Sequence, residues 1–378
     1  MKSISLPLFF ALLLPLGACG ATEREGYPSE AGTVQITEVA RGLEQPWALA
    51  LLPDGRMLVT EKPGRLRLVG KDGTISAPLG GVPKVDTVGQ AGLLDVALAP
   101  DFTTSRRIYL SYSEPRDKGN GTTVAHAVLG DTALSAFTVI FRQKPDKDSR
   151  QHFGSRLVFD RNGLLYVTLG DRGQSRAEAQ HLDGHLGKVV RLTADGKPAP
   201  GNPFLDRRDA APEIWSYGHR NAQGAALHPL TGKLWIHEHG PKGGDEINVP
   251  MPGRNYGWPI ITYGREYTGL KVGDGLTEKD GMEQPLHYWV PSIAPSGMAF
   301  YTADRFPAWQ GNLFVGSLKF GHLVRLQLDG EKIVKEERLL DGLKRRIRDV
   351  RQGADGYLYL LTDHSDGEIL RVGLDPKK

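Results

Sequence analysis

His152 is a candidate for proton transfer at neutral pH. It stands in the sequence QHFGSR, directly before an alternating apolar segment that runs from Ser155 to Phe159. An imidazole with an ordinary pKa near ~6.5 can act as a general base. A single loop histidine is more often solvated or structural, however, and the chain has eleven histidines. The assignment of His152 as a catalytic base therefore depends on partners elsewhere in the chain.

A group of donor side chains lies at residues 217–224, in the sequence YGHRNAQG. Arg220, Asn221 and Gln223 stand close together there, immediately before another alternating segment. Guanidinium and amide groups at such a position suit an anionic or carbonyl-rich ligand. The alternative is a turn that asparagine and glycine stabilise, with the arginine in solvent.

The sequence HEHGPKGGDEIN at residues 237–248 offers candidate metal ligands. On an extended strand His237 and His239 would share one face, whereas Glu238 would point to the other. No further nitrogen or sulfur ligand follows at a spacing typical of zinc. The glycine-proline turn, the carboxylate pair after it and Asn255-Tyr256 offer oxygen atoms, and calcium binds ~6–8 oxygens, backbone carbonyls included. The pattern therefore favours calcium over zinc.

Positive charges recur late in the chain, at Lys319 and in the sequence RRIR at residues 345–348. Taken alone, RRIR is typical of a solvated charge run. If these side chains converge with Arg220 on one site, the ligand should carry several carboxylates or phosphates. The chain has neither a Walker phosphate-binding loop nor a dinucleotide-binding glycine motif, which argues against a nucleotide.

The composition indicates an ordinary globular protein that is rich in turns. Of the 378 residues 24% are charged, the net charge is only +3, and no dense block of lysine and arginine alternates with aromatic residues. This argues against nucleic acid as a partner. The 47 glycines and 25 prolines favour short strands joined by turns over long helices.

Six segments share a polar turn followed by an alternating apolar strand. Such a hairpin cannot bury its apolar face alone, so repeated hairpins must stack on one another. An average of about 60 residues per unit exceeds the ~40–45 residues of a minimal four-stranded blade and leaves room for functional loops. We therefore predict an all-β fold, a six-bladed β-propeller over residues 33–378, with a pair of β-sandwiches as the alternative. The six segments are residues 53–60, 100–112, 160–171, 228–239, 307–318 and 353–363.

The first residues are expected to direct export. A charged start and a short apolar run indicate a secretory signal peptide over residues 1–18, too short to span a membrane. It ends in the sequence LGAC, which resembles a bacterial lipobox. We therefore expect Cys19, the single cysteine, to be lipidated and residues 19–32 to form a flexible tether. The folded part would then lie in the periplasm and touch a membrane only through its lipid. Cleavage near Ala18 without lipidation is the alternative.

The motifs together resemble those of soluble sugar dehydrogenases that depend on pyrroloquinoline quinone (PQQ), in particular the aldose sugar dehydrogenase branch of the glucose/sorbosone dehydrogenase family. The resemblance extends from Leu43 to Val372 and implies a six-bladed propeller. It rests on the order of the motifs LEQPWALALLPDG, GQAGLLDVALAPDF, HFGSRLVFDRNGLLYVTLGDRG, GHRNAQG, HEHGPKGGDEIN, NYGWP, APSG, SLK, RIRDV and LTD.

The resemblance implies an enzyme that oxidises aldoses at C1 to the lactone. The histidine of HFGSR, here His152, would take the proton of the anomeric hydroxyl while hydride moves to the C5 carbonyl of PQQ. Arg220 would stabilise the charge that develops on that carbonyl oxygen. Calcium would act on the quinone as a Lewis acid, held partly by the backbone carbonyls of Gly240 and Pro241. The physiological electron acceptor stays open.

The resemblance also assigns residues to cofactor and metal binding. PQQ carries three carboxylates, which would explain a convergence of Lys319, Arg346 and Arg348. Glu246 and Tyr256 match a second, structural calcium site. Further contacts with the cofactor or the substrate are implied for Gln90, Asn221, Gln223, Ser292 and Asp363.

Two differences from the glucose-specialised members concern the substrate. Gln151 stands before the histidine where those members carry an acidic residue. Residues 287–291 lack a clear counterpart of the aromatic substrate wall of those members. Both differences imply a more open site with broader sugar specificity.

The sequence leaves two other functions open. A calcium-dependent lactonase could use the same histidine and acidic loops without a quinone. A non-catalytic extracellular binding module could share the fold. The cationic set together with His152 argues against such a module, because a protein that only binds another protein does not need a site for a polyanion.

Overall fold

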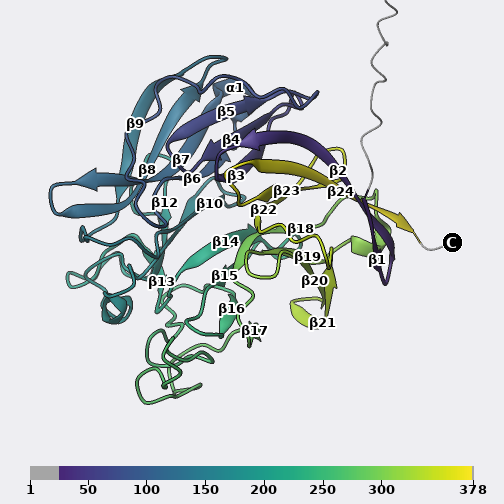
Figure 1. Ribbon diagram of the computed structural model, residues 1–378. Coiled ribbons are helices and arrows are strands. Elements are labelled where there is room, and N and C mark those ends of the chain that lie inside the picture. The colour runs from purple at the N-terminus through teal and green to yellow at the C-terminus, as the bar shows by residue number, and fades with distance from the viewer. Residues whose placement is uncertain (1–24, 377–378) are drawn as a thin grey trace, which may run out of the picture.

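The chain folds into a six-bladed β-propeller, as the repeats predict (Figure 1). This computed structural model describes residues 25–376, and in that part of the chain six antiparallel sheets surround a common axis. The first strand of each sheet contacts the first strand of the next, and the last of these contacts the first, which closes the ring. These inner strands are β3 (Pro46–Leu51), β6 (Leu93–Leu98), β10 (Gly154–Phe159), β14 (Ala222–Leu227), β18 (Pro295–Phe300) and β22 (Ile347–Gln352).

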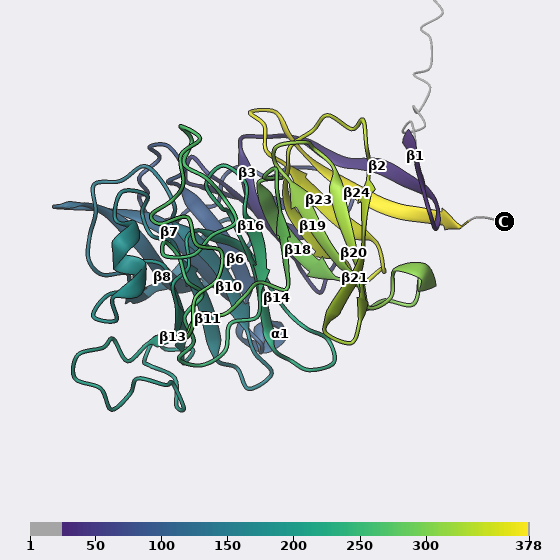
Figure 2. The same cartoon turned by 90° about the horizontal axis from the view of Figure 1, so that it is seen from below.

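Outer strands follow the inner strands through antiparallel pairings, and short helical turns lie in three connections (Figure 2). The turns are α1 (Phe102–Ser105), η1 (Arg176–Gln180) and η2 (Pro307–Trp309). The outer strands of the first five blades are β4 (Met57–Glu61), β5 (Arg65–Val69), β7 (Arg107–Arg116), β8 (Gly119–Leu129), β9 (Leu134–Arg142), β11 (Leu165–Leu169), β12 (Lys188–Leu192), β13 (Ile214–Tyr217), β15 (Leu234–Glu238), β16 (Asp245–Asn248), β17 (His287–Trp289), β19 (Leu313–Ser317), β20 (Leu323–Asp329) and β21 (Lys332–Leu339).

The sixth blade combines strands from both ends of the described chain. β23 (Leu358–Thr362) and β24 (Gly367–Pro376) follow β22, and β2 (Gly32–Leu43) pairs with β24 along its whole length. β1 (Glu25–Ser29) adds a fifth strand at the outer edge. Figures 1 and 2 both show β1, β2 and β24 side by side. Backbone hydrogen bonds between the two ends of the chain therefore hold the ring closed.

Residues 25–32 are not a flexible tether, which corrects that expectation. They form β1 and the turn into β2, because pairing with β2 satisfies the backbone groups of an otherwise isolated segment. The expected signal peptide over residues 1–18, the lipidation site Cys19 and the tether up to residue 24 lie outside the described residues. Within residues 25–376, no helix is long and apolar enough to cross a membrane.

The apolar core lies between neighbouring blades. Trp235 of β15 packs edge-on against Phe300 of β18 in the next blade, with ring centroids 5.5 Å apart. Tyr109 of β7 meets Phe159 of β10 in the same way at 4.8 Å. Each sheet therefore buries its apolar face against the next one, which is why the hairpin units must occur as a closed series.

Each inner strand carries a β-bulge near its start. A bulge leaves residues outside the ladder and redirects their side chains. Trp47, Gln223 and Arg348 stand at three of these bulges and line a cavity at one end of the axis. Asp95 and Arg156 stand at two others and are buried. The register shifts lie between Pro46 and Ala48, Leu93 and Val96, Gly154 and Leu157, Ala222 and Gly224, Ser296 and Met298, and Ile347 and Asp349.

Two arginines and two aspartates form an ion-pair network near the axis, which we call the axial network: the buried Asp95, Arg156 and Asp349 and the partly exposed Arg351. Arg156 Nη1 lies 2.8 Å from Asp95 Oδ1 and 3.3 Å from Asp349 Oδ1. Arg351 also reaches both carboxylates, at 3.1 Å and 2.9 Å. The guanidinium of Arg156 lies 4.4 Å from the ring centroid of Trp47. Side chains of alternating charge thus fill the centre of the ring. Apolar side chains at these positions would leave backbone groups near the axis without hydrogen-bond partners.

The axial network also binds the backbone of neighbouring blades. Asp349 accepts a hydrogen bond from the Leu49 amide of β3 at 3.0 Å, and Asp95 accepts one from the Leu157 amide of β10 at 2.7 Å. Arg156 donates to the Gln223 carbonyl of β14 at 3.0 Å. The network therefore connects the inner strands of five blades.

We predict that Asp95→Asn destabilises the fold by about 3–5 kcal/mol, because it removes one partner of a buried ion pair and leaves the positive charge of Arg156 undercompensated. Urea unfolding followed by tryptophan fluorescence measures the loss. Asp54→Asn, which breaks the exposed Arg56–Asp54 pair at 2.8 Å, is the matched control and should cost less than about 1 kcal/mol. Equal losses in the two variants would contradict a role of the axial network in holding the ring.

Candidate active site

An axial cavity of about 580 Å³ lies at one end of the ring. Its lining comes from the bulged starts of inner strands and from residues that directly follow second strands. Antiparallel pairing brings these two kinds of position to the same end of every blade. Lys62, Lys319 and Asp363 each follow the second strand of their own blade, and all three line the cavity.

Two arginines share one carboxylate at the wall of the axial cavity. Arg346 Nη2 and Arg348 Nη2 both donate to Asp363 Oδ2, at 2.8 Å and 3.1 Å. Arg348 Nη1 also donates to Gln223 Oε1 at 3.1 Å. Burial raises the pKa of Asp363, but Arg348 and Arg346 outweigh that effect and hold it below its ordinary value. Asp363 is therefore ionised and fixes both guanidinium groups.

Two lysines add further positive charge to the axial cavity. Lys62 Nζ donates to the Gly89 carbonyl at 2.7 Å, and burial lowers the pKa of Lys62 below its ordinary value. Lys319 Nζ lies 4.9 Å from the ring centroid of Phe320. Four cationic side chains thus face one carboxylate in this cavity, which suits a polyanionic ligand.

Three buried donor nitrogens around the site have no acceptor among residues 25–376. They are Arg348 Nε, Arg220 Nε and Asn221 Nδ2. A buried donor without an acceptor costs about 1–3 kcal/mol, so an oxygen-rich ligand that supplies acceptors would recover this free energy. The cationic lining and these donors together fit a quinone that carries carboxylates.

His152 and Asp171 form a hydrogen-bonded dyad beside the cavity. His152 is 7% exposed, and its Nδ1 lies 2.6 Å from Asp171 Oδ1. Asp171 also accepts hydrogen bonds from the Gly173 amide and from Trp258 Nε1, both at 2.7 Å. An ionised Asp171 keeps the proton of His152 on Nδ1, so Nε2 is the acceptor nitrogen. Within the described chain, Nε2 has no hydrogen-bond partner.

The backbone at His152 is fixed from three sides. The residue adopts φ 53°, in the left-handed region. Its amide donates to Gln90 Oε1 at 2.8 Å. Gly170 packs against its carbonyl so closely that a Cβ there would lie 2.0 Å from the oxygen. Gly170 is therefore required for the position of the histidine.

Burial lowers the pKa of His152 below its ordinary value. The hydrogen bond with Asp171 opposes this shift, whereas the positive charges of Arg220 and Arg172 reinforce it. His152 is consequently neutral at pH 7 and available as a base.

Arg220 lies between the dyad and the strand that carries the predicted metal ligands. Its amide donates to Glu238 Oε2 at 2.6 Å, and its Nη1 donates to the His239 carbonyl at 3.0 Å. Its carbonyl accepts a hydrogen bond from the Asp171 amide at 2.9 Å. The guanidinium lies 5.2 Å from the ring centroid of Trp258. Arg220 is thus held by contacts to its backbone and side chain, with Nε left for a ligand.

A small cavity of about 10 Å³, the size of one water or ion, adjoins Arg220. Its lining includes Glu238, Glu246 and Tyr256. The two carboxylates share Asn248 Nδ2, at 3.0 Å and 3.1 Å. Burial and the neighbouring charge of Glu238 raise the pKa of Glu246 to about 8. Two buried carboxylates side by side fit a cation that would balance their charge.

The loop after β15 gathers backbone oxygens at the same place. A Cβ on Gly240 would lie 2.2 Å from the Gly243 carbonyl oxygen and 2.3 Å from that of Gly244. Asp245 closes this loop by accepting hydrogen bonds from the Gly240 amide at 2.9 Å and from Ser292 Oγ at 2.7 Å. The donor set therefore consists of oxygens and fits calcium.

The alternation expected for the strand at residues 237–239 is confirmed. His237 Nε2 and His239 Nε2 both point to the next blade, where they meet the carbonyls of Gly297 at 3.3 Å and Pro295 at 2.6 Å. Glu238 points the other way, to His219 Nδ1 at 2.9 Å. Because both histidines bind carbonyl oxygens, neither offers that nitrogen to zinc.

Most of the predicted cofactor residues converge on the axial cavity: Gln90, Gln223, Lys319, Arg346, Arg348 and Asp363 all line it. Arg220, Asn221 and Ser292 do not, and Arg220 lines the small cavity instead. Asn221 Oδ1 accepts a hydrogen bond from the Gly154 amide at 3.1 Å, and Ser292 binds Asp245. Of the predicted metal ligands, Gly240, Glu246 and Tyr256 line the small cavity, and Pro241 does not.

Four residues of the site were not assigned from the sequence: Lys62, Asp171, Glu238 and Trp258. The positions of Lys62 and Asp171 in the sequence could have indicated a role in the site. Lys62 directly follows the second strand of its blade and Asp171 follows such a strand after one intervening residue, as Asp363 and Lys319 do in their blades. Trp258 had no such indication. It lies in the long connection between β16 and β17, and only the fold brings it to Asp171.

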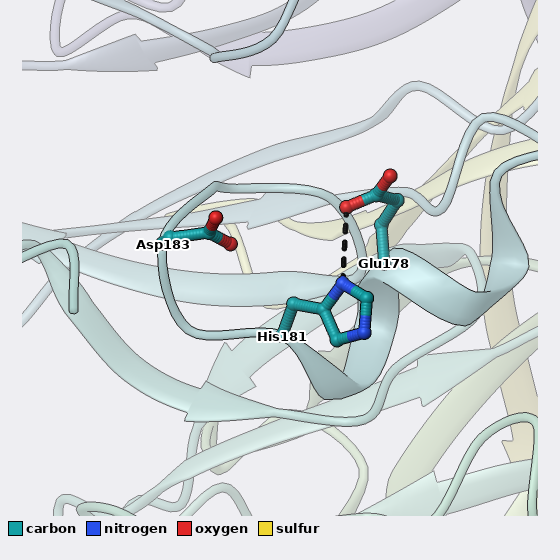
Figure 3. A group of neighbouring side chains, drawn as sticks. All are labelled: Glu178, His181 and Asp183. Carbon is teal, nitrogen blue, oxygen red and sulfur yellow. Dashed lines mark hydrogen bonds and ion pairs between the residues drawn. The ribbon is translucent and has the colours of Figure 1, made fainter. Parts of the chain in front are cut away.

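A separate cluster of Glu178, His181 and Asp183 lies on η1 and the turn after it (Figure 3). The ligand atoms lie within 4.8 Å of one another, and His181 Nδ1 is 3.4 Å from Glu178 Oε2. The side chain of His181 is 62% exposed. These residues line neither of the two cavities and take no part in the candidate active site.

Comparison with known proteins identifies the family of this propeller. Residues 43–371 match the family model described as glucose/sorbosone dehydrogenase. The chain belongs to this family. Aldose sugar dehydrogenase YliI of Escherichia coli K12 is 50% identical to it, over 90% of this chain and 93% of the relative.

Solved structures of sugar dehydrogenases are similar to this propeller over most of its length. A crystal structure of a glucose dehydrogenase is 52% identical, covers 90% of this chain and 99% of its own, and has a TM-score of 0.88. The PQQ-bound aldose sugar dehydrogenase of Streptomyces coelicolor is 30% identical, covers 92% of this chain and all of its own, and has a TM-score of 0.75. One structural neighbour of this chain is thus a PQQ-bound aldose sugar dehydrogenase.

Proposed function

We propose that this protein is a PQQ- and calcium-dependent dehydrogenase that oxidises aldoses at C1 to the lactone. The observation that carries the proposal is the position of a neutral histidine, oriented by a buried aspartate, beside a strongly cationic cavity. The bound quinone of the Streptomyces coelicolor relative supports PQQ as the ligand of that cavity.

The cofactor would be held mainly by charge. The carboxylates of the cofactor would be bound by Arg346, Arg348 and Lys319. Asp363 keeps the guanidinium groups of Arg346 and Arg348 in place before the cofactor binds. When bound, PQQ supplies a quinone carbonyl that accepts a hydride. The buried Nε of Arg348 and of Arg220 would donate hydrogen bonds to its oxygens.

His152 takes the proton of the C1 hydroxyl on Nε2. Asp171 keeps Nδ1 protonated, so Nε2 carries the lone pair that receives the proton of the sugar. The negative charge of Asp171 then stabilises the imidazolium that forms. The sugar loses one proton from O1 and one hydride from C1, and the C1–O1 double bond of the lactone forms. Trp258 and Gly173 hold Asp171 by two hydrogen bonds, which keeps the imidazole in one orientation.

Arg220 and a calcium ion would stabilise negative charge in the transition state. Arg220 is fixed by Glu238 and by the His239 carbonyl, so its charge is preorganised and needs no rearrangement during the reaction. Calcium supplies Lewis acidity, and the carbonyls of Gly240 and Pro241 are the expected ligands. Glu246 and the small cavity beside it would hold a second, structural calcium.

Chelator-treated protein should gain sugar-dependent dye reduction only when PQQ and calcium are both added. Lys319→Met and Arg346→Met should each weaken PQQ binding by ~10–100-fold, because each removes a charged hydrogen bond to a carboxylate. Titration of the cofactor absorbance measures the dissociation constant. Lys332→Met, which changes an exposed lysine on the outer strand β21, is the control and should bind PQQ like the wild type. Lactone hydrolysis without PQQ, or no binding of PQQ in the presence of calcium, would contradict the proposal.

The acid limb of the pH profile should report His152. The base form of His152 is lost as the pH falls through the pKa of its imidazole, and burial holds this pKa below the ordinary ~6.5. The value of kcat/KM should therefore be constant near pH 7 and decline only when the pH falls below ~6.5. Asp171→Asn removes a carboxylate that raises this pKa, so the limb should move to still lower pH. The rate on the plateau should also fall by ~10²–10⁴-fold, since the tautomer is no longer fixed. A limb above pH 7, or one unchanged in Asp171→Asn, would exclude His152 as the titrating base.

A further inference from the structure

A polar pocket of about 470 Å³ lies beside the dyad and is used by no step above. Two segments form it: residues 147–151, between β9 and β10, and residues 172–175, between β11 and η1. We call it the basic pocket, because Lys147, Arg150 and Arg172 line it together with a single carboxylate, Asp148.

Arg172 is the buried member of the basic pocket and forms no direct ion pair with a described residue. It is 1% exposed, and its guanidinium lies 3.5 Å from the ring centroid of Phe153. Its Nη2 donates to the Asn120 side chain and to the Ser149 carbonyl. Its Nε and Nη1 are buried and have no acceptor within residues 25–376, where no carboxylate lies within ion-pair distance of it. Burial, reinforced by the charge of Arg116, lowers the pKa of Arg172 to about 9, although the carboxylates of Asp171 and Asp86 oppose this shift.

The other charges around the basic pocket leave it positive. Lys147 Nζ lies 3.8 Å from Glu178 Oε1, a distance that gives only a weak pair at the surface. Gln151, Gln174 and the serines of the two segments add neutral hydrogen-bonding groups. An unpaired buried guanidinium flanked by two further cations and by neutral donors is the arrangement that binds a carboxylate or phosphate.

The basic pocket adjoins the proposed reaction site through the chain itself. Gln151 directly precedes His152, and Arg172 directly follows Asp171. The Arg150 carbonyl accepts a hydrogen bond from the Gln90 amide at 2.8 Å, and Gln90 lines the axial cavity. Residues that adjoin the dyad in the chain therefore line the basic pocket, and the Arg150–Gln90 hydrogen bond connects this pocket to the axial cavity.

We propose that the basic pocket binds a carboxylate or phosphate group, and that during turnover this group is an anionic substituent of the sugar. A sugar acid or sugar phosphate would place C1 at His152 and its charge at Arg172 and Arg150. This second part rests on the proposed dehydrogenase function. The first part concerns anion binding alone and does not depend on catalysis.

The first experiment measures inorganic phosphate binding to the metal- and quinone-free protein by calorimetry, with no turnover involved. Wild type should bind phosphate, and Arg150→Met and Arg172→Met should each weaken binding about tenfold or more. Lys118→Met, an exposed cation on the neighbouring β7–β8 turn that does not line the basic pocket, should bind like the wild type. Because Arg172 is buried, thermal unfolding is measured first to check that Arg172→Met is folded. If that variant is unfolded, the test rests on Arg150→Met, because Arg150 is at the surface. No phosphate binding, or equal binding in Arg150→Met, would overturn the proposal.

The second experiment compares kcat/KM for glucose, glucose 6-phosphate and glucuronate in the PQQ-loaded enzyme. The anionic sugars should be preferred about tenfold or more, and Arg150→Met should remove the preference while leaving glucose oxidation unchanged. If phosphate binds but the anionic sugars are not preferred, the basic pocket binds a free anion. That result would contradict only the proposal that the anion belongs to the sugar substrate. Phosphate binding without turnover of any sugar would contradict the dehydrogenase function and leave the anion site standing.

Discussion

The axial network is the interaction on which the rest of the structure depends. No covalent bond joins the two ends of the chain in a propeller ring, and the edge of each inner strand that faces the axis leaves backbone groups without ladder partners. Asp95 and Asp349 accept hydrogen bonds from those groups, while Arg156 and Arg351 balance their charge. Trp47 stacks on Arg156 and lines the cavity above it, so the network also forms the base on which the site is built.

The same geometry explains why the site is assembled from so many blades. Residues at the bulged starts of inner strands and residues just after second strands all reach one end of the axis. Gln223 and Arg348 use the first kind of position, and Lys62, Lys319 and Asp363 use the second. Five of the six blades contribute polar groups to the lining, and the last blade supplies three of them, Arg346, Arg348 and Asp363. The cationic cavity is therefore a property of the ring, with Asp363 as its one internal counter-charge.

The hairpin repeats carry local signals that predict the fold, whereas most residues of the cavity were assigned through the resemblance to the glucose/sorbosone dehydrogenase family. The sequence did not show that residues 25–32 extend the last blade: β1 pairs with β2, and β2 joins that blade only through β24, more than three hundred residues away. Asp171 was visible as the end of a strand, but its contact with His152 crosses a bulged hairpin that periodicity does not reveal. The hydrogen bond from Trp258 to Asp171 and the Arg172 nitrogens that have no acceptor result from tertiary packing, which sequence patterns do not show.

The central claim is that His152, held by Asp171, accepts the proton of the sugar. Stopped-flow reduction of the PQQ-loaded protein, compared between wild type and His152→Gln, tests it most directly. Glutamine can keep a hydrogen bond to Asp171 but cannot take a proton. We expect PQQ to bind His152→Gln as it binds the wild type, with sugar-dependent bleaching of the quinone slowed by ~10²–10⁴-fold. Bleaching at the wild-type rate in the loaded variant would contradict the account.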